Sequence, residues 1–179
     1  EQEFFLIPRK EYYRRPDLQL AGRTVLGTHA PRGQETCDHY MSAINPIALQ
    51  CMPAGQHECF LMGIPLRTRH REVAPNQYEV APLFGLATTQ IDQNLWVMQM
   101  LEEVAARHGL AALVEEKPFN DVNGSGKHNN FSLGTDTGVN LLNNKDIAAA
   151  TGNPGGSACM HFLMTGGAGC PTAAHCPGK

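Results

Sequence analysis

The first seven residues crowd aromatic and β-branched side chains into a short run, Glu-Gln-Glu-Phe-Phe-Leu-Ile, and this pattern predicts a β-strand. Alternate side chains of a strand point to one face, so Glu1 and Glu3 are expected side by side. Residues 8–36 are rich in Pro, Gly and Arg, which indicates a loop with short elements.

The clearest helical pattern runs from Thr89 to His108. We expect Thr89 to cap this helix and Gly109 to end it. Trp96 and the methionines of the helix are interpreted as core residues rather than as a cofactor site. The apolar positions that recur at helical spacing are Ile91, Leu95, Met98, Leu101 and Ala105.

Residues 37–62 carry apolar side chains at mixed spacing, interrupted by Pro46 and Pro53. Each proline is expected to end or kink any helix there. Ala111–Val114 reads as a further short strand that leads into a glycine-containing loop. The chain as a whole therefore predicts a mixed, α+β class of fold.

Two carboxylates flank a turn further along the chain. Pro75-Asn76 is a turn signal between two strand-like runs, so Glu72 and Glu79 are expected to converge across a hairpin-like loop. Taken singly, each carboxylate is more typical of a solvated surface. Together with Glu1 and Glu3 they form a set that suits hard divalent cations, Mg²⁺ or Mn²⁺.

The segment 117–132 places a cation, a glycine loop, a histidine and a hydroxyl at fixed spacing. The small residues 124–126 let main-chain N–H groups approach a charged ligand, and His128 is a candidate metal ligand, with a hydrogen-bonded turn histidine as the alternative. A Walker A loop is excluded, because Asp121 stands where the first glycine is required and His128 where Ser or Thr is required.

Composition narrows the class of protein. The 179 residues are 42% hydrophobic and 17% charged, with a net charge of −3, which is typical of one globular domain and gives no basic patch for nucleic acid. No apolar run reaches the roughly 20 residues of a membrane span. The chain begins at Glu1 rather than Met, so we expect a fragment or a processed product of a cytoplasmic protein, with an organelle stroma left open.

The cysteines predict reduced thiols, because nothing in the sequence indicates a secreted protein. The end of the chain also holds His161 and His175, residue types that bind zinc, but it has no C-x2–4-C knuckle and a plain tail is favoured. The six cysteines are Cys37, Cys51, Cys59, Cys159, Cys170 and Cys176.

Three motifs stand in a fixed order: the E-x-E strand, the run E-V-A-P-x-Q-x-E from Glu72 to Glu79, and K-P-F-x3-N-G-S-G-x-H-x3-S from Lys117 to Ser132. They resemble the catalytic domain of glutamine synthetase, and in particular its type III branch. The likeness covers residues 1–146 as a partial catalytic domain. The resemblance implies an antiparallel half-barrel sheet with flanking helices, here incomplete, and residues 147–179 form a divergent low-complexity tail predicted to be poorly ordered.

The family resemblance also implies an activity, the ATP-dependent ligation of ammonia to L-glutamate through γ-glutamyl phosphate, in a homo-oligomeric ring. Mg²⁺ or Mn²⁺ would be the cofactor. Carried over to this sequence, Asn123 and Gly124 bind glutamate, and Asn130 and Ser132 lie on the ATP side. The implied metal ligands are Glu3, Glu72 and Glu79 for one cation, and Glu1 and His128 for the second.

The chain departs from the family pattern after Asp146. The family continues into an arginine-rich segment and a last metal carboxylate, whereas this chain has no arginine after Arg107. We therefore expect the full-length parent to be the ligase and the fragment alone to be inactive. The alternatives are a non-catalytic remnant or structural relative with the same fold, and a ligase that uses another amine.

Overall fold

A computed structural model describes residues 1–29, 33–35 and 40–152. The chain divides into two compact units, Glu1–Asn129 and Asn130–Lys179, and each is described by itself. Within the described ranges, no helix is long and apolar enough to span a membrane.

The first unit is built on a four-stranded antiparallel sheet in the order β2-β3-β1-β4. Its strands are β1 (Gln2–Pro8), β2 (Leu66–Arg71), β3 (Gln77–Pro82) and β4 (Leu110–Leu113). The predicted opening strand, the hairpin between the two later carboxylates and the short strand near residue 111 are all present. The α+β class is confirmed.

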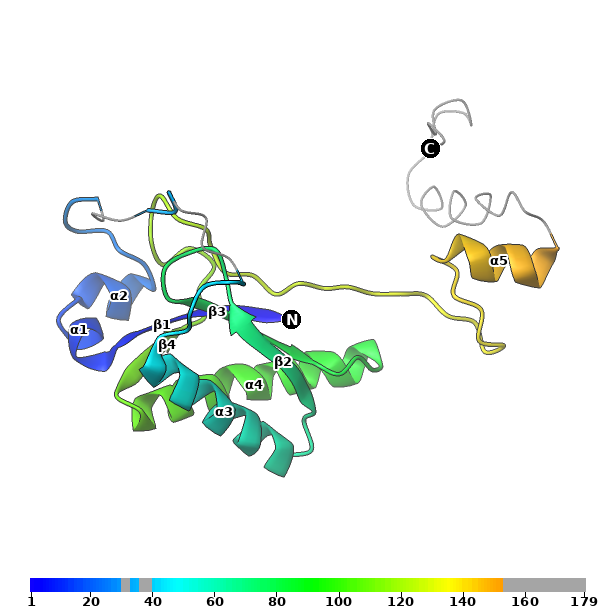
Figure 1. The fold of residues 1–179 in the computed structure, drawn as a ribbon, viewed down its shortest axis with the longest axis horizontal. Helices are drawn as coiled ribbons and strands as arrows, with labels where there is room; N and C mark the ends of the chain where they lie inside the picture. The colour runs from blue at the N-terminus through cyan, green and yellow to red at the C-terminus, as the bar shows by residue number, and fades with distance from the viewer. Residues whose placement is uncertain (30–32, 36–39, 153–179) are drawn as a thin grey trace. The chain divides into compact units, whose positions relative to one another are not determined.

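The two faces of the sheet have different partners, because side chains alternate along each strand. Phe4 and Leu6 lie on one face with Tyr78 and Val80, in a core formed with residues of α3 (Pro46–Leu61) and α4 (Ala87–Arg107). Figure 1 shows both helices on this side of the sheet. The other face holds a smaller cluster of Phe5, Leu18, Ala74, Leu113 and Val122. The polar residues of the candidate site lie on this same face, outside the cluster.

Helix α3 contains both of the prolines considered in the sequence. Pro46 occupies the first turn after Asn45, whose side chain accepts a hydrogen bond from the Ile47 amide at 2.9 Å, a position that tolerates proline. Pro53 lies inside the helix, which continues to Leu61. Interior proline costs about 3 kcal/mol, and the burial of Cys51, Met52, Gly55 and Cys59 on this helix offsets that cost.

Helix α4 begins at Ala87 and has no side-chain cap, so the capping role predicted for Thr89 is wrong. Gly109, at φ 70°, follows the last turn as predicted. Trp96 is 53% exposed, so its interpretation as a core residue is wrong, whereas Met100 packs against the core. The buried residues are Val97, Leu101, Val104 and Ala105, because only the second half of the helix finds a packing partner.

The segment after β1 forms two short helices, α1 (Arg9–Tyr13) and α2 (Pro16–Ala21). Asp17 fixes this segment, since its carboxylate accepts hydrogen bonds from the Arg15 side chain and from the amides of Val25 and Leu26. The Arg15 guanidinium and these amides hold the pKa of Asp17 well below its usual range.

The described part of the second unit contains α5 (Asn144–Thr151). The Asn143 side chain caps it by accepting from the Lys145 amide at 3.0 Å, and Ile147 is buried. The predicted tail, residues 147–179, thus begins inside this helix. Its cysteines and histidines, like Cys37, lie outside the described residues.

Candidate metal and substrate site

A row of ionisable side chains crosses the sheet on the face away from α3 and α4. Glu3 of β1 pairs with Glu79 of β3, which pairs in turn with His70 of β2. Like charges directly opposite each other destabilise a sheet. Glu3 is 7% exposed and Glu79 4% exposed, so their pairing should destabilise the fold. Destabilising arrangements of this kind are typical of functional sites.

His70, Glu72 and Glu79 form the first cluster. Nε2 of His70 lies 2.7 Å from Oε2 of Glu79 and 3.1 Å from Oε1 of Glu72. Glu72 is 6% exposed, so the interpretation of this pair as solvated surface carboxylates is wrong. The Tyr40 ring packs edge-on against His70 with centroids 4.8 Å apart, and the nearby Glu72 carboxylate raises the pKa of Tyr40.

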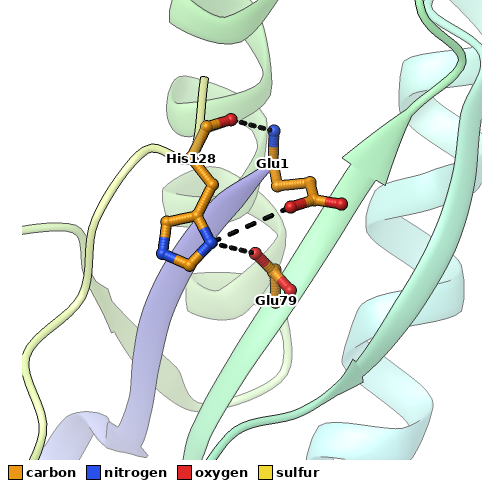
Figure 2. Close-up of side chains that lie close together, drawn as sticks. All are labelled: Glu1, Glu79 and His128. Carbon is orange, nitrogen blue, oxygen red and sulfur yellow. Dashed lines mark hydrogen bonds and ion pairs between the residues drawn. The ribbon is translucent and has the colours of Figure 1, made fainter. Parts of the chain in front are cut away.

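Glu1, Glu79 and His128 form the second cluster, in which the three side chains point toward one another (Figure 2). Nδ1 of His128 is 3.6 Å from Oε1 of Glu79 and 3.8 Å from Oε2 of Glu1. The loop and strand are joined through the main chain, since the His128 amide donates to the Glu1 carbonyl at 2.9 Å. This contact places a residue 127 positions away beside the start of β1.

Glu79 belongs to both clusters, with one carboxylate oxygen in each. Among the described residues, its Oε1 atom is buried with no hydrogen-bond partner. Burial is the main cause that raises the pKa of Glu79, followed by the negative charge of Glu1. A buried acceptor that lacks a donor is costly, and a divalent cation would satisfy it. The residues present therefore fit Mg²⁺ or Mn²⁺, for which carboxylate oxygens are the preferred ligands.

Glu3 faces the glycine loop. Its Oε2 accepts a hydrogen bond from the Gly126 amide at 2.8 Å and lies 3.6 Å from Nε2 of His128. The structure thus brings Glu1, Glu3, Glu79 and His128 together on one side, and Glu72 with Glu79 on the other. The assignment of these five residues to two separate cations stays a prediction.

The two residues predicted to bind the substrate glutamate, Asn123 and Gly124, lie on the same glycine loop as Gly126. The Gln34 amide donates to Oδ1 of Asn123 at 3.1 Å, and Oε1 of Gln34 accepts from the Asn123 amide. A Cβ atom at Gly124 would overlap the carbonyl oxygen of Glu116, so only glycine fits there. Lys117 donates a hydrogen bond to the Val122 carbonyl, a contact within the loop segment that stabilises its conformation.

The two residues predicted to contact ATP belong to the second unit. Asn130 and Ser132 are exposed there, and their role stays a prediction. Conversely, sequence reasoning gave no role to His70 or Gln77, although both stand in the run around Glu72. The available signal was the two-residue spacing of His70 and Glu72 just before the turn, which places side chains on one face of a strand.

The family is decided by comparison with known proteins. Residues 1–163 match the family model described as glutamine synthetase, catalytic domain. The chain belongs to the glutamine synthetase family. It is 53% identical over 142 residues to the type-3 glutamine synthetase of Dictyostelium discoideum and 49% identical over 142 residues to the glutamine synthetase of Butyrivibrio fibrisolvens. These alignments cover 79% of this chain but only 19% and 20% of the relatives, so the chain spans about a fifth of their length.

Solved structures support the same family fold. "Apo GmaS without ligand" matches with a TM-score of 0.56 and 26% identity, covering 78% of this chain and 30% of that one. The "GmaS/ADP complex" matches with a TM-score of 0.52 at 23% identity and covers 79% and 30% of the two chains, which supports the fold alone. The predicted likeness to the glutamine synthetase catalytic domain is confirmed.

Proposed function

We propose that this chain is part of a longer ATP-dependent ligase that joins ammonia to the γ-carboxylate of L-glutamate. The observation that carries the proposal is the position of Glu79, buried within a glutamine synthetase catalytic domain between two clusters of carboxylates and histidines. The reaction would pass through γ-glutamyl phosphate: a carboxylate oxygen of glutamate attacks the terminal phosphorus of ATP and ADP leaves. Ammonia then attacks the acyl carbon, phosphate leaves and glutamine forms.

The proposed metal ligands follow the family pattern. Glu3, Glu72 and Glu79 would hold one Mg²⁺ or Mn²⁺, and Glu1 and His128 would hold part of the second. Bound cations supply the positive charge that offsets the repulsion between an anionic carboxylate and an anionic phosphate. The chain's own contribution is to keep the carboxylates buried and converging, so that they need little reorganisation to bind a cation.

The glycine loop would bind the amino acid. Asn123 and Gly124 are the proposed contacts with glutamate, and the hydrogen bonds of Gln34 and Lys117 hold this part of the loop in place. Asn130 and Ser132 are the proposed contacts with ATP. Fixed positions matter because two reactants held in register react far faster than free ones.

We further propose that the 179-residue chain is inactive by itself and that the longer protein assembles into a ring of identical subunits. The limited share of the relatives' length that this chain covers supports the inactivity of the isolated chain, and membership of the glutamine synthetase family supports the ring. Residues 1–146 would then form part of the catalytic domain. Residues 147–179, which include part of α5, would be the divergent tail.

The proposed function is tested with the full-length parent, purified free of metal and assayed with ATP and glutamate. Glutamine should form when ammonium and Mg²⁺ or Mn²⁺ are added, and chelation should abolish the reaction. A small primary amine such as ethylamine, offered in parallel, tests the alternative of another acceptor, and its preferred use would contradict the assignment to ammonia. Metal binding without turnover of either amine would instead favour a non-catalytic relative.

A further inference from the structure

Gln77 is a buried polar side chain to which the metal and substrate assignments give no role. It is 1% exposed and lies at the start of β3, two residues before Glu79. Its Nε2 donates to the Gly124 carbonyl at 2.8 Å and to Oγ of Ser125 at 3.2 Å. Its Oε1 accepts from the Ala74 amide at 3.2 Å. The side chain is thus fully bonded, and it joins two segments 47 positions apart in the sequence.

The main chain of Gln77 also closes the turn between the two later carboxylates. Its carbonyl accepts from the Glu72 amide at 2.8 Å, and its amide donates to the Ala74 carbonyl at 3.1 Å. One residue therefore fixes the turn that carries Glu72 and at the same time contacts the glycine loop. A buried amide that loses a hydrogen-bond partner costs free energy. Movement of the loop away from Gln77 would leave this amide unpaired and is therefore unfavourable.

The loop is held on its other side as well. The Ser125 amide donates to the Glu116 carbonyl at 2.8 Å, and the close approach of Gly124 to Glu116 leaves no room for a side chain. Gly124 thus lies between the Gln77 amide and the Glu116 carbonyl. Loss of the Gln77 contact would release the face of the loop that points toward the metal-bearing turn.

We propose that Gln77 is a positioning residue that sets the place of the glutamate-binding loop relative to the metal carboxylates. The inference rests on the proposed function, because it concerns the same site. Among the described residues, the Gln77 side chain hydrogen-bonds to the loop through Gly124 and Ser125 and to none of the proposed metal-ligand side chains. Its removal should therefore act on glutamate binding and leave metal binding unchanged.

The test compares Gln77→Met with Gln56→Met in the full-length parent. Methionine keeps the length of glutamine and removes its hydrogen bonds. Gln56 is the matched control, because its amide also donates to a main-chain carbonyl, that of Leu66 at 2.7 Å, but it lies on α3 and away from the loop. Loss of one or two such bonds predicts a rise of roughly tenfold in KM for glutamate in Gln77→Met.

The same variants are measured for KM of ATP and for Mn²⁺ affinity by titration calorimetry. We expect both constants within about twofold of the parent's values in Gln77→Met, and no change of any constant in Gln56→Met. An unchanged KM for glutamate would overturn the proposal. So would a parallel change of all three constants, which would indicate general destabilisation.

Hydrogen–deuterium exchange separates this inference from the proposed function. A parent that forms no glutamine contradicts the proposed function before any variant is compared. The positioning role is then read from the amides of Gly124 and Ser125, the two loop residues that Gln77 contacts, which should exchange at least tenfold faster in Gln77→Met and unchanged in Gln56→Met. Equal exchange in the two variants would overturn the role of Gln77 whatever the activity.

Discussion

At the scale of single residues, Glu79 has two opposing properties. Burial is the main cause that raises the pKa of its carboxylate, and the negative charges of Glu1, Glu72 and Glu3 raise it further, while His70 lowers it. The ionised form is therefore less favourable in the folded protein than it is for a carboxylate in water. The negative charge of Glu79 is needed to bind a cation. The residue therefore lowers the stability of the metal-free fold and raises the affinity of the site for metal.

Replacement of Glu79 by glutamine should separate these two properties. Mn²⁺ binding to the full-length parent should weaken by about tenfold or more, as ligand losses commonly do. In the presence of chelator the variant should unfold at the same or a higher temperature than the parent, because a neutral amide removes the repulsion. Calorimetric titration and thermal unfolding measure the two effects.

The control for Glu79 is Glu103→Gln on the exposed surface of α4, where the carboxylate accepts a hydrogen bond from Gln99 of the same helix. This change should leave the Mn²⁺ affinity unaltered. Unchanged metal binding in Glu79→Gln would refute the assignment of Glu79 as a ligand.

Gly124 offers a second test at this scale. Alanine there places a Cβ against the main-chain oxygen of Glu116, which cannot move aside without shifting the loop. We expect Gly124→Ala to cost about 1–3 kcal/mol of unfolding free energy, as overpacking does. Gly134→Ala, where nothing lies within 4 Å of the added atom, should stay within about 0.5 kcal/mol. Urea unfolding compares them, and equal losses would show that the close approach at Gly124 does not matter.

At the scale of elements, α3 carries two thiols on its buried face. Cys51 and Cys59 are 2% and 1% exposed, and burial raises the pKa of each thiol to about 11. Because the thiolate is the reactive form, neither should react with a disulfide reagent at pH 8 in the folded protein. Peptide mapping by mass spectrometry should find both labelled only after denaturation, and rapid labelling of native Cys51 would contradict this packing of α3.

The same thiols predict a pH dependence of stability. Their folded pKa of about 11 lies above the ordinary value of 9.0, so the folded state retains protons that the unfolded state releases. The contribution is complete below pH 9 and is lost as the pH rises from 9 to 11. Denaturant unfolding over this range should show a falling free energy, with a smaller slope in Cys51→Ala.

At the scale of the whole molecule, the described surface leaves apolar side chains without cover. Phe84 is 89% exposed, Leu86 78% and Leu95 63%, and β2 and β4 are the edge strands of the sheet. Exposed apolar groups and open strand edges favour association with other segments. These features agree with a chain that forms part of a larger protein.

We expect the isolated 179-residue chain to show no γ-glutamyl hydroxamate formation under conditions in which the full-length parent is active. Loss of one group that stabilises the transferring phosphoryl group costs about a hundredfold or more in rate. This chain has no arginine after Arg107 to supply such a group. Robust turnover by the isolated chain under identical Mg²⁺ and ATP would show that the active site is placed wrongly.

The sequence by itself determined the features that depend on neighbouring residues. The Glu1–Glu3 strand and the turn between Glu72 and Glu79 were predictable, because side-chain alternation and turn residues act locally. The end of α4 at Gly109 was predictable for the same reason. The order of the motifs was also enough to identify the glutamine synthetase family.

Only the tertiary structure decided the features that depend on distant contacts. The continuation of α3 through Pro53 and the exposure of Trp96 follow from which helix faces find a packing partner, and local periodicity does not contain that information. The position of Glu79 between the two clusters depends on the register of β1 with β3 and on the loop that brings His128 back to the sheet. The roles of His70 and Gln77 likewise arise from contacts across the sheet, where residues far apart in the sequence become neighbours.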